Sequence, residues 1–488
     1  MRRRLVGWNS RMAKNSLRIR RIHRADPTAR CQLADLQAQL GAQGNVVSAR
    51  GKALTEKVFG EALPPIKVVE RICADVQARG LAAVLHYTEQ FDRATLTEET
   101  IRVRRKELVD AHAAADPAFL AAIRRVRRNI MTFQYGVLPR DAILHVEGSH
   151  ELRMRYRPMH RVGVMIPGGA AAYPSTLLMT ICPAQAAGVK ELAVIMPPTK
   201  TGAYNNDQLA VCHELGVEEV YRVGGAQAVA ALAYGVEGIP PVDMIVGPGN
   251  LFVALAKRHV YGKVAIDCIA GPSEIVVVAD DSACPEYVAS DMLAQAEHAP
   301  GASILVTWHA PLLDAVTEAL ERRLARLERG DLARESLENF GALVQALDLA
   351  DAAACVNQIA PEHLHVATRF PDAVADRIDN AGAIFLGHYS PVALGDYAAG
   401  PSHVLPTAGT ARFTSGLSAI DFLRRSSILC FGPEGLANMA DDVRLLARKE
   451  GLTAHAASVE VRLKRETTKA TKDTKKKNEI ECQAQTNL

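Results

Sequence analysis

The chain has 488 residues, of which 48% are hydrophobic and 23% are charged. Its length suggests about two to four domains with hydrophobic cores of their own, and its composition excludes a small disulfide scaffold, a disordered chain and a collagen-like fibre. The 57 Lys and Arg residues nearly balance the 54 Asp and Glu residues, which leaves a formal net charge of +3 and no global field that would attract nucleic acid or a membrane surface.

The two ends differ in composition from the rest of the chain. Residues 1–16 are rich in Arg and contain no acid, which predicts a disordered leader; a true start at Met12 and a mitochondrial transit peptide are the alternatives. Residues 463–488 are rich in Lys and Thr and predict a disordered basic tail. Because the sequence has no long apolar run, no secretory signal and nine cysteines without a C-x-x-C pair, we expect a cytoplasmic protein with reduced thiols.

The opening third of the chain, up to about Pro158, has a helical pattern. One stretch places apolar side chains at helical spacing and predicts a buried face made of Val68, Val69, Ile72, Val76 and Leu81.

From Arg161 onward, short β-branched runs alternate with helical segments. The predicted strands are VGVMI, LAVIM, EVYRV, DMIV, EIVVVA and SILVT. Strand–helix alternation of this kind predicts parallel α/β layers, and the absence of a fixed repeat disfavours solenoids and propellers.

Three glycine-rich loops follow predicted strands and lead into helices. They begin at Ile166 (IPGGAAAYPST), Val223 (VGGAQAVAALAYG) and Ile245 (IVGPGNLFVALAKR). Ligands of open parallel sheets gather beyond the carboxyl ends of strands, where the exposed N–H groups of a helix can hold a phosphate. None of the loops matches G-x-G-x-x-G, and each is also compatible with an ordinary tight turn.

A metal-binding pattern comes from residues that are far apart in the chain. Gln295 and His298 stand at i and i+3 of a predicted helix and would share one face. Asp396 and His455 lie in turn-rich segments where they have no evident packing role. Four such nitrogen and oxygen donors suit Zn²⁺, whereas a lone His on a helix is more often structural.

The adjacent pair Glu362–His363 precedes the predicted strand LHVAT. Reference pKa values near 4.3 and 6.5 would let these two groups divide base and water-activating work. A solvated turn is the alternative interpretation of the pair, and we expect His365 to be structural.

Ten blocks, taken together, make the chain similar to histidinol dehydrogenase from about Leu17 to Leu463. They are RVGVMIPGG, GGAQAVAALAYG, VDMIVGPGN, AKRHVYGKVAIDCIAGPSEI, QAEH, IAPEHL, NAGAIFLG, GDYAAGPSHVLPT, ARF and EGLTAHA. The resemblance implies a zinc-dependent, NAD-linked cytoplasmic homodimer with one Zn²⁺ per subunit. Such an enzyme oxidises L-histidinol to L-histidine through L-histidinaldehyde, reduces two NAD per turnover, and has neither a nucleic-acid nor a membrane partner.

The resemblance also assigns roles to residues of this chain. Glu362 and His363 match the catalytic acid–base pair, and Gln227 and Asn250 match positions that touch NAD. The matched zinc ligands are Gln295, His298, Asp396 and His455. The matched substrate contacts are these four ligands together with Ser273, His363 and Glu450.

The implied fold is α/β, with two incomplete Rossmann-like parallel-sheet domains. We expect an N-terminal helical arm over 17–60, a first, discontinuous domain over 61–164 and 275–408, and a second, NAD-binding domain over 165–274. A C-terminal helical tail over 409–462 would cross to the partner subunit, so that Glu450 and His455 complete the partner's site.

One departure from the family concerns Met165, which stands where a tyrosine usually packs on the cofactor. Two other functions stay open at this point: a relative that oxidises another small amino alcohol or diol, and a zinc-binding homologue without turnover. Covalent catalysis by a cysteine is disfavoured, because the one Cys–His neighbour pair, Cys212–His213, falls in a helical run.

Overall fold

The computed structural model describes residues 16–40, 49–146, 149–168, 171–298 and 300–463. All of the predicted leader except Ser16 and all of the predicted basic tail except Leu463 lie outside these residues. The chain divides into a larger unit, residues 1–138 and 158–422, and a smaller unit, residues 139–157 and 423–488. Among the described residues, no helix combines the length and the apolar character that crossing a membrane requires.

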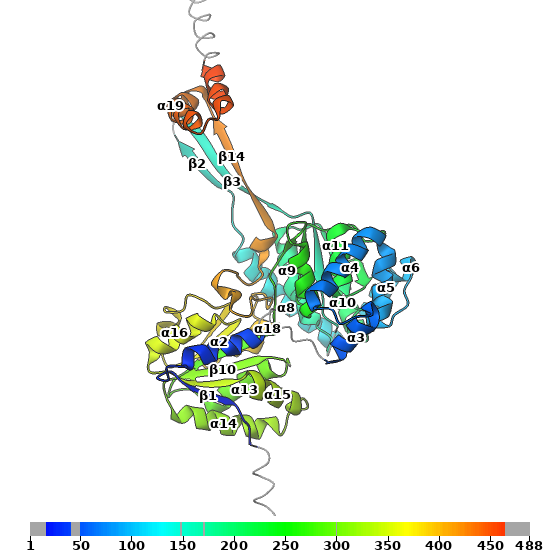
Figure 1. The fold of residues 1–488 in the computed structure, drawn as a ribbon, viewed down its shortest axis with the longest axis vertical. Helices are drawn as coiled ribbons and strands as arrows, with labels where there is room; N and C mark the ends of the chain where they lie inside the picture. Colours follow the sequence, from blue (N-terminus) through cyan, green and yellow to red (C-terminus); the bar gives the residue numbers. More distant parts are fainter. Residues whose placement is uncertain (1–15, 41–48, 147–148, 169–170, 299, 464–488) are drawn as a thin grey trace, which may run out of the picture. The chain divides into compact units, whose positions relative to one another are not determined.

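The larger unit contains two parallel sheets with helices on both faces (Figure 1). The first sheet has the strand order β1-β11-β10-β9-β12-β13, and the second has the order β6-β5-β4-β7-β8. The predicted α/β fold with two Rossmann-like sheets is therefore confirmed. The six strands predicted from β-branched runs are all present, as β4 (Arg161–Met165), β5 (Glu191–Met196), β6 (Glu219–Arg222), β7 (Met244–Val246), β9 (Glu274–Ala279) and β10 (Ala302–Thr307).

Alternation along strand β9 shows how the first sheet is built. Ile275 and Val277 face one layer, formed by α13 (Pro285–Ala296), α14 (Pro311–Leu324) and α15 (Gly330–Phe340). Val276 and Val278 face the opposite layer, formed by α2 (Ala29–Leu40) and α16 (Leu349–Ile359). Because both faces are covered, every residue of this strand is buried, which explains its uninterrupted apolar run. The sheet is completed beyond β10 by β11 (Ala342–Gln345) and β1 (Arg20–His23), and on the other side of β9 by β12 (His363–Ala367) and β13 (Ala383–Leu386).

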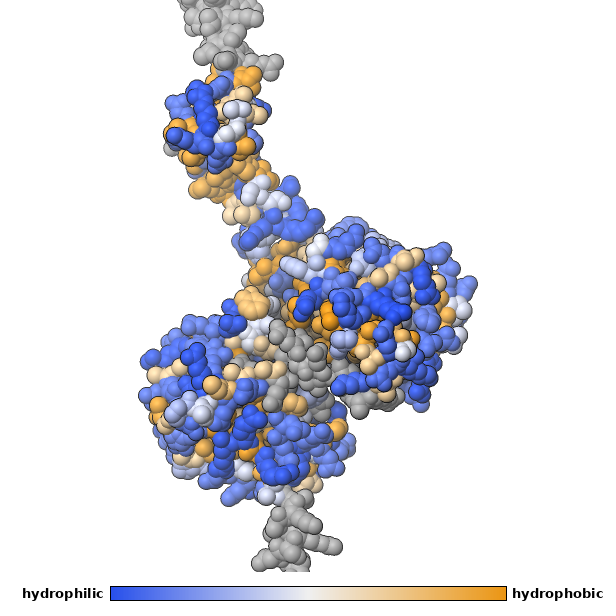
Figure 2. Space-filling view, in the orientation of Figure 1, coloured by the Kyte–Doolittle hydropathy of each residue, from blue (hydrophilic) through white to orange (hydrophobic). Residues whose placement is uncertain are grey.

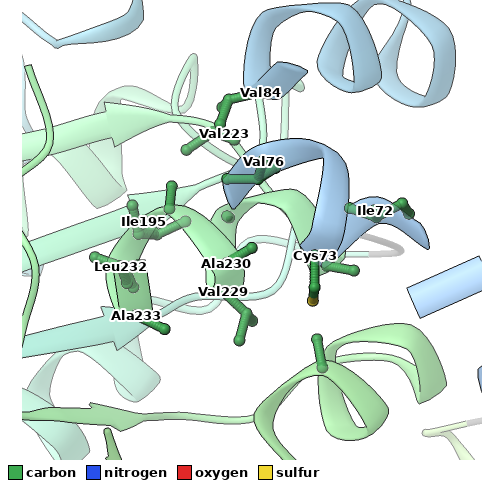
Figure 3. Close-up of a cluster of buried hydrophobic side chains, with 14 of the residues drawn as sticks. Ile72, Cys73, Val76, Val84, Ile195, Val223, Val229, Ala230, Leu232 and Ala233 are labelled. Carbon is green, nitrogen blue, oxygen red and sulfur yellow. The ribbon is translucent and has the colours of Figure 1, made fainter. Parts of the chain in front are cut away.

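The second sheet is also covered on both faces. One layer consists of α4 (Pro65–Arg79), α5 (Leu81–Asp92), α11 (Gly225–Tyr234) and α12 (Leu251–Val260), and its side chains interlock with those of the strands (Figure 3). All five apolar residues predicted to form a buried helical face, Val68, Val69, Ile72, Val76 and Leu81, lie in this core. The other layer includes α8 (Pro117–Gly136), α9 (Pro174–Ala187) and α10 (Asn206–Glu214), with α7 (Arg105–Ala114) packed on α10. Strand β8 (Ala265–Ile266) ends the sheet.

Several predicted boundaries differ from the structure. Helices α4 and α5 pack on the second sheet, so this part of 61–164 does not belong with the first domain, and the second sheet begins at Arg161 rather than at 165. The arm over 17–60 is not wholly helical, because β1 pairs with β11 in the first sheet before α2 and α3 (Ala49–Phe59).

The smaller unit corrects the helical prediction further. It contains a three-stranded sheet of β2 (Ala142–Val146), β3 (His150–Pro158) and β14 (Leu423–Phe431), followed by α19 (Pro433–Lys449) and a helix over 453–463. Arg153, Arg155 and Arg157 alternate with half-buried residues along β3, which is the period-two pattern of a strand. The opening third therefore stops being helical near 138, and the tail over 409–462 is not all helix.

Candidate active site

A cavity of about 590 Å³ lies at the carboxyl ends of strands in the second sheet. Its walls include all three glycine-rich loops, through Gly168, Gly224–Gly225 and Pro248–Gly249–Asn250. The strand order changes direction between β4 and β7, and the loops after these two strands flank that switch point. The sequence placed the three loops at strand ends, and the structure brings them together around one cavity.

A buried ion pair fixes the loop that carries Asn250. Lys257 of α12 bonds the Asp267 carboxylate and donates from Nζ to the Gly247 carbonyl oxygen over 3.0 Å. The Gly247 N–H donates to the second oxygen of Asp267 over 2.7 Å. Gly247 has φ +106°, and a Cβ there would lie 2.2 Å from the Met165 carbonyl oxygen, so only glycine fits at this position.

The residues predicted to touch NAD lie in the wall of this cavity. Asn250 caps α12, because its side-chain oxygen accepts from Phe252 N–H and Val253 N–H over 3.0 and 3.2 Å. Gln227 is buried in the first turn of α11. Met165 ends β4 and lines the same cavity. The cap orients the N-terminus of α12 toward the cavity, where a helix end favours an anion.

The Glu362–His363 pair lies in the first sheet and is buried, which excludes the solvated-turn alternative. His363 opens β12, opposite Ile275 of β9. Glu362 accepts from the Ser273 hydroxyl and from Glu274 N–H, the latter over 2.9 Å. These residues therefore gather at the amino ends of β9 and β12, whereas we expected the chemistry beyond carboxyl ends of strands.

Carboxylates surround the His363 ring. Its Nδ1 lies 3.2 Å from the Glu274 carbonyl oxygen and 3.6 Å from the Glu362 carboxylate, and its Nε2 lies 3.6 Å from Asp396. Burial alone would lower the pKa of His363, but the carboxylates of Glu362 and Asp396 raise it to about 9. Burial raises the pKa of Glu362, and His363 opposes that shift. The buried Nε2 has no hydrogen-bond partner among the described residues, which leaves it available to a ligand.

Three of the four predicted metal ligands belong to this region. His298 and Asp396 each shift the pKa of the other, and His363 shifts the pKa of both. Desolvation lowers the pKa of His298, and the neighbouring histidines lower the pKa of Asp396 against its own burial. A neutral imidazole and an ionised carboxylate are the protonation states that metal ligands need. Gln295 is buried, and its Nε2 has no partner among the described residues.

The local geometry of these ligands differs from the prediction in two details. Helix α13 ends at Ala296, so His298 lies just beyond the helix, with its backbone N–H bonded to the Gln295 carbonyl oxygen over 3.2 Å. Asp396 lies in the short helix α18 (Val392–Tyr397) rather than in a turn. Within the described ranges, no group of three or more His, Cys, Asp and Glu side chains is arranged to hold a metal ion; Gln295 is none of these types.

Glu450 and His455, also predicted for the site, belong to the smaller unit. Glu450 caps α19, and His455 lies on the helix over 453–463 rather than in a turn-rich segment. Both residues are exposed within that unit. The larger unit therefore supplies Gln295, His298 and Asp396, and it does not contain the fourth predicted ligand.

Two further residues near the pair were missed by the sequence reasoning. Glu274 is buried beside Glu362, and burial together with that neighbouring carboxylate raises its pKa to about 8. His403 donates from Nδ1–H to the Asp396 carbonyl oxygen over 2.9 Å. Both residues lie in motifs already singled out, GPSE and GPSHVLP, so their position beside the named residues was the available signal.

Two residues that were set aside are structural, as predicted. His365 is buried, with Nδ1 2.7 Å from the Asp291 carboxylate and Nε2 2.9 Å from the Gly387 carbonyl oxygen. Cys212 is buried in α10, and burial raises the pKa of its thiol to about 12, so the thiolate that covalent catalysis needs is disfavoured.

Two parallel sheets of Rossmann-like connectivity, a cavity walled by glycine-rich loops and a buried Glu–His pair are typical of an α/β enzyme of the dehydrogenase class. A sequence profile described as histidinol dehydrogenase matches residues 63–463. The chain therefore belongs to the histidinol dehydrogenase family, as the sequence motifs predicted.

Individual relatives agree with this assignment. The chain is 57% identical over 430 residues to the histidinol dehydrogenase of Rhodopirellula baltica, covering 88% of this chain and 94% of the relative. It is 48% identical over 400 residues to that of Geobacillus kaustophilus, with 82% and 94% covered. The crystal structure of histidinol dehydrogenase from Elizabethkingia anophelis superposes with a TM-score of 0.83 at 32% identity, covering 92% of this chain and 99% of that one.

Proposed function

We propose that this protein oxidises L-histidinol to L-histidine through L-histidinaldehyde, with two NAD reduced per turnover, as the last step of histidine biosynthesis. The observation that carries the proposal is the buried Glu362–His363 pair, which faces Asp396 on one side and Ser273 on the other. Family membership supports the substrate, and the glycine-walled cavity supports a dinucleotide.

The residues around the pair fit one Zn²⁺ per subunit, held by Gln295, His298 and Asp396 together with His455 of the partner subunit. The donor set supports this, because a neutral imidazole, an ionised carboxylate and an amide suit a borderline metal. A bound Zn²⁺ would supply positive charge that orients the amine and imidazole of the substrate and offsets the negative charge of Asp396.

His363 acts as the general base in both oxidation steps, because a bound Zn²⁺ would offset the Asp396 carboxylate that raises the pKa of His363 and would leave the imidazole neutral. Its free Nε2 takes the proton from the substrate hydroxyl while the carbinol carbon loses a hydride, which NAD accepts when bound, and the aldehyde forms. Glu362 then removes a proton from the water that adds to the aldehyde carbon. While the water adds, protonated His363 returns its proton to the aldehyde oxygen, which gives the hydrate and restores the base. The hydrate then loses a hydroxyl proton to His363 and a hydride, which a second NAD would accept when bound, and the carboxylic acid forms.

Ser273 of the same subunit and Glu450 of the partner subunit complete the substrate contacts in this proposal. The Ser273 hydroxyl donates to Glu362 and holds that carboxylate in place for the water. Gln227 and Asn250 contact NAD from the cavity wall. Met165 would cover the cofactor through its flexible thioether, without a phenol's hydrogen bond.

A homodimer with shared active sites follows from this assignment of His455 and Glu450. The smaller unit supports it, because Figure 2 shows apolar side chains on the surface of that unit. More than half of each side chain is exposed at Ile143, Leu144, Leu429, Leu445 and Leu446. An exposed apolar surface of this extent is typical of a protein–protein interface, and a second copy of the chain is the occupant that the proposal requires.

The test is NAD reduction by the purified protein on addition of L-histidinol, followed by absorbance of NADH. We expect two NADH per histidinol consumed, loss of the reaction after treatment with a metal chelator, and recovery on adding Zn²⁺. A simple amino alcohol without an imidazole serves as the control substrate. Equal rates with that control, or one NADH per histidinol, would contradict the proposal.

A further inference from the structure

The cofactor cavity has two chemically different walls. The loop wall offers backbone N–H groups and helix N-termini from α11 and α12, which suit a pyrophosphate. The opposite wall comes from α3, α4 and α5 and is apolar, with Leu54, Val68, Ile72 and Phe91 on its surface. A purine ring needs such an apolar surface, so the adenosine half of a dinucleotide belongs against this wall.

Asp92 stands in the apolar wall, as the last residue of α5. Among the described residues that line the cavity it is the one ionisable side chain, and no Lys or Arg accompanies it. It makes no hydrogen bond or ion pair with any residue that the structure describes, and burial raises the pKa of its carboxyl to about 6. A carboxylate without a partner in a partly buried cavity wall destabilises the fold, which indicates a role toward a ligand.

We propose that Asp92 accepts hydrogen bonds from the ribose hydroxyls of the adenosine half of NAD and thereby excludes NADP. An ionised carboxylate is an acceptor only, and the donors that a nucleotide offers beside its purine are the ribose hydroxyls. A 2′-phosphate would bring nearly two more negative charges to the same place, and no cation among the described lining residues would offset them.

This arrangement differs from the ordinary dinucleotide site. In doubly wound folds, an acid about 20 residues after the glycine-rich turn bonds the ribose. Here the glycine-rich loops begin at Ile166, whereas the acid comes from α5, which packs over the second sheet. The inference rests on the proposed use of NAD, and it adds the residue that chooses between the two dinucleotides.

The test measures binding of small probes by calorimetry, because binding can be read without turnover. The probes are 5′-AMP and adenosine 2′,5′-bisphosphate, which are the adenosine halves of NAD and NADP, followed by the two dinucleotides. The protein variants are wild type, Asp92→Asn, Asp92→Ser and, as the matched control, Glu89→Gln. Glu89 is an exposed carboxylate on the same helix that does not line the cavity.

We expect wild type to prefer 5′-AMP and NAD, and both Asp92 variants to lose about 10-fold to 100-fold in affinity for them. Their preference over the 2′-phosphorylated probes should shrink by at least about tenfold, while Glu89→Gln matches wild type. An unchanged preference in folded Asp92→Asn and Asp92→Ser, checked by thermal unfolding, would overturn the inference. A wild-type protein that binds NAD with this preference but does not oxidise histidinol would instead overturn the proposed function alone.

Discussion

The two sheets of the larger unit carry their functional residues at opposite edges. In the second sheet, the cavity opens beyond the carboxyl ends of β4 and β7, where glycine-rich loops lead into helices. In the first sheet, Ser273, Glu362 and His363 gather at the amino ends of β9 and β12. Two sheets of the same parallel class therefore carry their candidate sites at different ends of their strands, with the cavity at the carboxyl ends and the Glu362–His363 pair at the amino ends.

The polarity of helices explains this division. At the carboxyl edge of a parallel sheet the following helices present their N-termini, whose partial positive charge favours a phosphate. At the amino edge the preceding helices end, and their carbonyl groups favour cations. Gln295 and His298 lie at the end of α13, and Asp396 lies in the last turn of α18. The amino edge is thus suited to a metal ion, and the carboxyl edge to a dinucleotide.

The substitution with the largest expected effect is His363→Asn, which should impair the amino edge and leave NAD binding at the carboxyl edge intact. We expect turnover to fall by about 10² to 10⁴-fold, because a positioned general base contributes that much. The affinity for NAD should stay within about twofold, since His363 lies outside the cofactor cavity. Steady-state kinetics with histidinol, NAD titration by calorimetry, and zinc content by elemental analysis measure the three quantities, and zinc should be retained.

His365→Asn is the matched control, because His365 lies two residues away on the same strand. Its ring contacts Asp291 and Gly387 rather than the site. The control should lose about 1 to 3 kcal/mol of stability while keeping turnover per folded molecule. Near-native turnover in His363→Asn would show that another group is the base.

The loop before Asn250, at the carboxyl edge, can be perturbed separately by Lys257→Met. This change leaves the Asp267 charge buried without its cation, which costs about 3 to 5 kcal/mol, and it releases the hydrogen bond to Gly247. We expect a lower apparent unfolding temperature and at least about tenfold weaker NAD binding, because the loop before Asn250 loses its support. Thermal unfolding and calorimetry measure both effects.

Lys263→Met removes an exposed lysine just after the same helix and should change neither property. Zinc content should stay unchanged in both lysine variants, since the proposed metal ligands lie around the first sheet and in the smaller unit. If Lys257→Met bound NAD as tightly as wild type, the ion pair would support the fold without shaping the cofactor loop.

The strands that were predicted from the sequence share one property. EIVVVA and its counterparts are buried on both faces, so their apolar runs are continuous and easy to see. Strands β3 and β14 carry exposed residues and several charges, β2 is exposed along its whole length, and β1 is short, so the same criterion missed them. The placement of α4 and α5 on the second sheet depends on contacts across more than 100 residues, which local periodicity does not encode.

At the site, too, some features could be predicted from the sequence and others could not. The glycine-rich loops were found because tight turns and close backbone approach restrict residue choice, as at Gly247. The amino-edge location of Glu362 and His363 was missed, because the rule for ligands of open sheets names the carboxyl ends. Glu274 was missed since its significance arises only when folding sets it beside Glu362.

Glu274→Gln, at the amino edge, is the substitution with the smallest expected effect. The folded pKa of Glu274, about 8, lies above the ordinary value of 4.5, so the folded state holds its proton more tightly and stability falls as pH rises through that window. At neutral pH glutamine resembles the protonated acid, and turnover should change by less than about twofold. From about pH 7 to about pH 9 the variant should gain on the order of 1 kcal/mol over wild type, measured by unfolding at each pH. Glu335→Gln, at an exposed position, should follow wild type at every pH. A constant difference between Glu274→Gln and wild type would mean that Glu274 is already ionised at neutral pH, and that the amino edge holds two buried carboxylates beside one imidazole.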